Sequence, residues 1–102
     1  MRWTSVIYLL TATYKQDNLQ QVLKSYDKHK VFANKFSISK MEFSAAGQLG
    51  LKPDVAYQVL TSEYAGEEFV EIDGLRYHVY RSQENGDKTV LYLQREVADD
   101  GV

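Results

Sequence analysis

The chain has no cysteine among its 102 residues. Disulfide bridges and cysteine-based metal sites are therefore excluded, and nothing indicates an oxidising compartment. No apolar run approaches the roughly 18 residues of a membrane-spanning helix. The short apolar segment Val6–Leu10 lacks the flanking features of a signal peptide. We therefore expect a protein of the cytoplasm with no membrane partner.

The chain also lacks an excess of charge of one sign. It carries 12 lysines and arginines against 14 aspartates and glutamates, a formal net charge of −2. Proteins that hold nucleic acid through its phosphates usually show a basic excess or a basic face. Any contact with DNA should therefore be loose and non-specific. No repeat, low-complexity segment or linker interrupts the sequence, so we expect one domain, residues 1–102, with one modest core.

Most of the chain consists of short segments rich in β-branched and aromatic residues, separated by polar turns. Such segments predict strands. The charged residues 27–30 are either a loop or the polar part of a longer strand. Asp73-Gly74 and the Asn-Gly pair within residues 82–87 predict tight hairpin turns. The expected strands are residues 3–14, 21–26, 31–39, 55–61, 69–72, 75–81 and 88–97. This order predicts a mainly β fold, a small antiparallel barrel or sandwich.

One segment is typical of a helix instead. Ser39 followed three residues later by Glu42 predicts a capping box, in which each residue satisfies a backbone N–H near the other. Gly50 suits the left-handed position after a helix, and Pro53 prevents its continuation. We expect one short helical insertion over about residues 40–49. Its apolar row is narrow, so it must dock on something to be stable: Met41, Ala45 and Leu49.

No pattern predicts catalysis, a cofactor or a metal site. His29 and His78 stand alone, without converging ligands. A group of acidic residues is best interpreted as a solvated strand edge that discourages pairing between chains: Glu63, Glu67, Glu68, Glu71 and Asp73. No nucleophile elbow or phosphate loop is present. We expect that the protein is not an enzyme.

Aromatic and basic residues alternate on the last strands. These are Arg76, Tyr77, Tyr80, Arg81, Tyr92 and Arg95. Such a face could stack bases in a nucleic-acid-binding barrel. The alternative, which the net charge favours, is cross-strand packing of the rings under the arginines.

The order of short motifs from Val31 to Val97 resembles the phage head-closure, or head–tail joining, family. The resemblance covers about two thirds of the chain and depends on the order and spacing of the pieces. The motifs are Ser39–Phe43, Ala45–Gly47, Gly50–Pro53, Tyr64–Glu67, Gly74–Tyr77, Arg81 and Leu91–Leu93.

The resemblance implies a structural β-barrel subunit of the virion that assembles into a ring, six-fold in preference to twelve-fold. The ring would lie between portal or adaptor proteins above and tail proteins below, close the DNA-filled head and dock the tail. A tail completion protein is the related alternative. The helical segment would line or gate the channel through which DNA passes: Lys40, Glu42, Ser44, Gln48 and Lys52. Contacts between subunits would involve Tyr64, Phe69, Tyr80 and Arg81.

Overall fold

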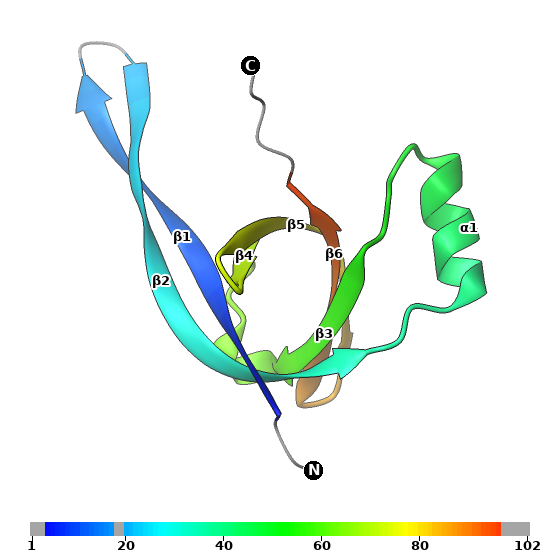
Figure 1. The fold of residues 1–102 in the computed structure, drawn as a ribbon. Coiled ribbons are helices and arrows are strands. Elements are labelled where there is room, and N and C mark those ends of the chain that lie inside the picture. Colours follow the sequence, from blue (N-terminus) through cyan, green and yellow to red (C-terminus); the bar gives the residue numbers. More distant parts are fainter. Residues whose placement is uncertain (1–3, 18–19, 97–102) are drawn as a thin grey trace.

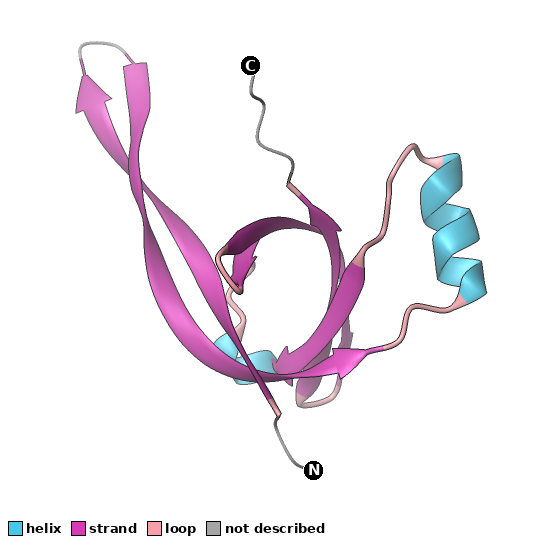
Figure 2. Cartoon of the chain, viewed as in Figure 1, coloured by secondary structure: helices cyan, strands magenta, loops and turns pink. Residues whose placement is uncertain are grey.

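The computed structural model describes residues 4–17 and 20–96, with the side chains of residues 15–24 left out. Its six strands close into an antiparallel barrel in the order β1-β2-β3-β6-β5-β4 (Figures 1 and 2). The strands are β1 (Ser5–Asp17), β2 (Gln20–Phe36), β3 (Val55–Leu60), β4 (Phe69–Ile72), β5 (Leu75–Asn85) and β6 (Lys88–Arg95). A nine-residue helix, α1 (Lys40–Gln48), and a 3-10 turn, η1 (Thr61–Glu63), complete the fold. The predicted β-barrel with one short helical insertion is confirmed.

The first half of the chain contains two strands and not the predicted three. Residues 27–30 belong to β2, which pairs with β1 from Ser5↔Ala33 to Asp17↔Gln20. The turn predicted over residues 15–20 is therefore shorter, and residues 18–19 lie outside the described residues. The charged stretch tolerates strand geometry because its lysines lie on the outer surface, where Lys28 Nζ lies 3.0 Å from a carboxylate oxygen of Glu71. Beyond the barrel, β1 and β2 continue as a projecting hairpin (Figure 1).

Alternation along the strands separates the barrel interior from its outer wall. Alternate residues of each strand point inward, and their side chains form one core. Its buried members are Ile7, Leu9, Val31, Ala33, Val59, Val70, Ile72, Leu91 and Leu93. A second, smaller cluster lies on the outer wall of β3 and β6: Ala56, Val90 and Tyr92, with Ile38 and Tyr80 packed against them.

The C-terminal hairpins are built on tight turns, as predicted. Asp73 (φ 53°) and Gly74 (φ 80°) both occupy the left-handed region, which the two-residue hairpin turn between β4 and β5 requires. The loop predicted over residues 82–87 is mostly strand, since β5 pairs with β6 up to Asn85↔Lys88. Only Gly86 and Asp87 form the turn.

Candidate functional site

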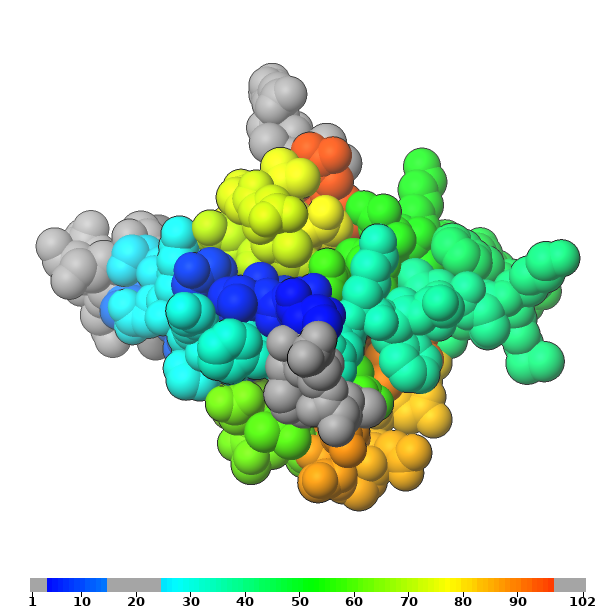
Figure 3. All heavy atoms as spheres, turned by 60° about the horizontal axis from the view of Figure 1, so that its bottom comes forward, coloured from blue at the N-terminus to red at the C-terminus, as the bar shows by residue number. Residues whose placement is uncertain are grey.

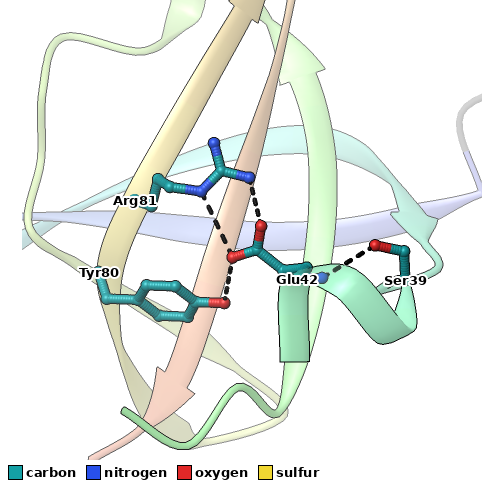
Figure 4. Close-up of polar contacts among 4 residues, drawn as sticks. All are labelled: Ser39, Glu42, Tyr80 and Arg81. Carbon is teal, nitrogen blue, oxygen red and sulfur yellow. Dashed lines mark hydrogen bonds and ion pairs between the residues drawn. The ribbon is translucent and has the colours of Figure 1, made fainter. Parts of the chain in front are cut away.

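An irregularity in β5 positions the most distinctive polar cluster of the molecule. Val79 pairs with Leu93 and Arg81 pairs with Tyr92, so Tyr80 is an extra residue in the ladder. In a regular strand, neighbouring side chains point to opposite faces, but a bulge changes this alternation. Tyr80 and Arg81 therefore both project from the outer wall. There they meet the helix α1 (Figure 4).

Glu42 of α1 receives both of these side chains. The Tyr80 hydroxyl donates to Glu42 Oε2 at 3.0 Å. Arg81 donates from Nε to Oε2 at 3.3 Å and from Nη2 to Oε1 at 2.5 Å. The Arg81 guanidinium also lies 4.2 Å from the centre of the Tyr92 ring. We call the contacts of Glu42 with Tyr80 and Arg81 the arm anchor, and the segment Ser39–Pro53 the arm.

The electrostatics of the arm anchor favour its charged form. Hydrogen bonding from Arg81 is the main cause that lowers the pKa of Glu42, opposed by burial and assisted by the Tyr80 hydroxyl. Burial, followed by the hydrogen bond to Glu42, raises the pKa of Tyr80 well above its ordinary value. The hydrogen bonds that Arg81 donates to Glu42 raise the pKa of Arg81. A carboxylate, a neutral phenol and a guanidinium are therefore the stable combination at neutral pH.

The arm has its own capping interactions at both ends. At the start, the Ser39 hydroxyl accepts a hydrogen bond from the Glu42 backbone N–H at 3.1 Å. At the end, Gly50 takes φ 79°, and the Leu51 N–H donates to the Ala46 carbonyl at 2.9 Å. The predicted capping box is only half correct. The Glu42 side chain bonds instead to Tyr80 and Arg81 on the barrel wall, because Arg81 brings a full positive charge that a backbone N–H cannot offer.

The face of α1 that meets the barrel is not the predicted one. Ala46, one turn after Glu42, is the buried residue of the helix and is 3% exposed. The apolar row expected to dock points away instead, with Met41 81% and Leu49 78% exposed. Figures 1 and 3 show the arm outside the closed barrel, projecting from one side of the molecule. The short helix is thus held on the wall through Glu42 and Ala46.

Of the residues predicted to line a channel, Glu42 faces the wall of its own barrel. The others are exposed: Lys40, Ser44, Gln48 and Lys52. The Lys52 backbone N–H donates to the Gln94 side chain at 2.7 Å, which fixes the end of the arm beside β6. The exposed members of the set are therefore two lysines and two neutral polar residues, and the acidic member of the predicted set is turned toward the barrel.

The residues predicted for subunit contacts all make contacts within the chain. Tyr64 packs against the barrel core, and its hydroxyl donates to the Glu67 carbonyl at 2.8 Å. Phe69 lies edge-on to Tyr26, with ring centres 5.9 Å apart. Tyr80 and Arg81 are the two partners of Glu42. Tyr64, Phe69 and Tyr80 are half-buried, whereas Arg81 is exposed.

The six aromatic and basic residues of β5 and β6 do not share one face. Tyr77 packs against the interior core. Tyr80, Arg81 and Tyr92 surround Glu42 and the cluster beneath the arm. Arg76 and Arg95 line a groove elsewhere on the barrel. The alternation of side chains along the strands and the bulge at Tyr80 place the six residues on different faces. The alternative that the net charge favoured, cross-strand packing of rings under an arginine, describes Tyr80, Tyr92 and Arg81.

The remaining candidate residues are dispersed. His29 is exposed on β2, whereas His78 lies 5.4 Å from Phe69, ring centre to ring centre. The acidic residues of the β4 region include Glu71, which pairs with Lys28. Within residues 4–17 and 20–96, no group of three histidine, aspartate or glutamate side chains could hold a metal ion. Among those residues, no helix is long and apolar enough to span a membrane.

Sequence reasoning missed the arm anchor because it depends on a bulge. The one available signal is a break in alternation. Tyr77 and Val79 alternate regularly, and a further large side chain, Tyr80, follows Val79 directly. A bulge was one explanation for this break. Their shared partner, Glu42, lies 38 residues from Tyr80 and 39 from Arg81 in the sequence and could not be deduced from local patterns.

No protein-family model and no curated protein matches the chain.

Proposed function

We propose that the chain is a structural subunit of a phage or prophage head–tail connector. It closes the DNA-filled head below the portal or adaptor ring and offers the docking surface for the tail. In this proposal the protein catalyses no reaction, needs no cofactor and functions in the virion after assembly from the host cytoplasm. Subunits associate into a ring, with six-fold symmetry preferred.

The position of the arm carries this proposal. A helical insertion between β2 and β3 lies outside a closed barrel and is attached through Glu42 and Ala46, with its apolar row exposed. A helix of nine residues is marginal in water by itself, so a change of surroundings during assembly can move it at low energetic cost. The barrel supplies the rigid wall that an assembled ring needs.

A second observation links the sequence motifs to this geometry. The Glu-Phe motif at Glu42 and the arginine that ends the Gly74–Tyr77 hairpin motif lie far apart in sequence, yet Glu42 and Arg81 are in direct contact. The Gly50–Pro53 motif supplies the left-handed turn that ends the helix. Three of the motifs on which the resemblance depends therefore serve one structural feature, the attachment of the arm.

The exposed side of the arm suits passage of DNA without retention. Lys40 and Lys52 are its exposed cations, and Ser44 and Gln48 are exposed neutral polar residues. Phosphate contacts raise affinity for DNA steeply with each cation involved. With only these two lysines exposed, the arm would hold DNA weakly and would allow the genome to pass when the arm moves into the channel or out of it.

Electron microscopy of the protein on phage heads tests the proposal. Purified protein is added to DNA-filled, portal-bearing heads, taken before tail joining from the phage or prophage that encodes it. The proposal predicts ring-shaped density directly below the portal or adaptor. Density only on isolated tails would favour the tail completion alternative, and density on neither would contradict both assignments. Heads without a portal serve as the control.

A titration with DNA separates the connector from a nucleic-acid-binding module. A connector should bind DNA weakly, with a shallow dependence of the logarithm of affinity on the logarithm of salt concentration. Tight binding with a steep slope would require many lysine and arginine contacts with phosphates. That result would favour the binding module instead.

A further inference from the structure

The part of the outer wall that holds the arm is a binding surface in its own right. Tyr80 and Arg81 form its polar half and donate hydrogen bonds to Glu42 of α1 (Figure 4). Its apolar half is the outer-wall cluster of Ala56, Val90 and Tyr92. We call Tyr80, Arg81 and this cluster the arm seat. The seat fits a helix that presents a carboxylate and, one turn later, a small residue such as Ala46.

The arm of the same chain fills this seat only in part. Ala46 is the one buried residue of α1. A hollow of about 300 Å³ remains where the arm joins the barrel, and Phe36 and Phe43 are among the residues that line it. Met41 and Leu49 are exposed, so the arm also carries apolar surface that its own barrel does not cover. Because the seat buries so little apolar area of α1, the arm can leave it at low energetic cost.

Two connections join α1 to the barrel and decide how far it can move. Residues 37–39 lead into it from β2, and residues 49–54 lead from it to β3. An extended residue spans about 3.3–3.6 Å, so the shorter connection reaches about 10 Å. The arm can therefore reach the seat of a second copy only where the walls of the two copies lie side by side. Neighbouring subunits of a ring meet this condition.

We propose that, when copies of this chain assemble, the arm of one copy leaves its own seat and binds the arm seat of the next copy. Glu42 then pairs with Tyr80 and Arg81 of the neighbour. The contacts are the same within one chain and between two, so the exchange of an identical element is a low-cost route to assembly. Passed from each copy to the next, it is a head-to-tail contact, which closes into a ring if the rotation between copies allows. The inference rests on the proposed connector for its place in the virion and names the contact between subunits of that ring.

Two charge-reversed variants test arm exchange in solution, without phage heads. Glu42→Arg reverses the charge of the arm, and Arg81→Glu reverses that of the seat. In either variant alone, arm and seat carry like charges and repel each other, both within a copy and between copies. In an equimolar mixture, opposite charges meet only between unlike copies.

Light scattering after size-exclusion chromatography measures the association. We expect the mixture to form heteromers at least about tenfold more tightly than either variant associates alone, since a charge-assisted hydrogen bond contributes about one tenfold step in affinity or more. In the heteromer, isotope-filtered NMR should show contacts between α1 of the labelled Glu42→Arg chain and the Tyr80 ring of the unlabelled Arg81→Glu chain. The pair Glu42→Lys and Arg81→Asp repeats the test with smaller side chains.

A matched control uses Glu84→Arg in place of Glu42→Arg, which makes the same change of charge at an exposed residue of β5. Its mixture with Arg81→Glu should show no gain in association. No heteromer in either charge-reversed pair, or a heteromer without the contacts between α1 and the Tyr80 ring of the other chain, would overturn arm exchange. Ring density on heads combined with that result would leave the connector proposal standing with another subunit contact. Arm exchange without density on heads would contradict the connector alone.

Discussion

Replacing Glu42 by glutamine should loosen the arm while leaving the barrel intact. Glu42→Gln keeps the size of the side chain and one acceptor for the Tyr80 hydroxyl but removes the charge that faces Arg81. Hydrogen bonds to charged groups contribute about 1.5–3 kcal/mol when buried, whereas exposed ion pairs contribute about 0–1 kcal/mol. The Glu42 side chain is 13% exposed and that of Arg81 is 42% exposed. The arm anchor lies between these limits, so we expect a loss of about 1–2 kcal/mol, a factor of about 5–30 in the population of detached arm.

Amide hydrogen exchange, which detects local opening, measures this loss directly. In Glu42→Gln, exchange of the α1 amides should accelerate by about 5–30-fold, while amides of the β6 core around Leu91 and Leu93 should be nearly unchanged. Glu84→Gln, which neutralises an exposed glutamate on the same strand as Arg81, is the matched control and should alter neither set. The effects of Glu42→Gln and Arg81→Gln should not add, because both remove the same contact. Equal acceleration of the α1 and core amides, or none in α1, would refute the argument.

Three further predictions concern the arm and the core. Ala46→Leu should displace the arm, at a cost of about 1–3 kcal/mol from overpacking, whereas Ala45→Leu, on the exposed side, should not; amide exchange in α1 separates the two. Leu91→Ala, at a fully buried position, should lower the free energy of unfolding by about 2–5 kcal/mol in urea titrations, and a loss below about 1 kcal/mol would mean that the interior is not the packed core. Because the pKa of Glu42 is lowered, its stabilisation of the arm is complete above the ordinary value of 4.5 and is lost as pH falls through the lowered value. The Tyr80 ring signals should titrate in that acidic range and cease to do so in Glu42→Gln.

The positions of most strands could be predicted from the sequence because they follow from local patterns. β4 was predicted at its observed bounds, Phe69–Ile72, because turn residues mark both ends. The prediction wrongly divided β2 into two strands at residues 27–30. A run of charged residues is equally typical of a loop and of the solvent-exposed part of a strand. Register against β1 decides between the two, and register is a non-local property.

The arm illustrates the same division between local and long-range information. Its helix, its Ser39 cap and the left-handed Gly50 follow from residues within a few positions of one another. Its orientation does not, because the apolar row Met41–Leu49 predicts one docked face and the Glu42 contacts impose another. A bulge in β5 brings Tyr80 and Arg81 to the same side, and the sequence offers only a faint break in alternation to indicate it.

Retention of packaged DNA tests most directly whether the arm acts as the closing element of the head. The natural protein and a variant without residues 44–50 are each added to DNA-filled heads that lack the connector, and DNA released into the medium is measured with a nuclease. Circular dichroism first establishes that the shortened chain keeps its strands. We predict that the natural protein protects the DNA and that the shortened protein attaches to the heads but leaves them leaking. Equal protection by both proteins would contradict the account.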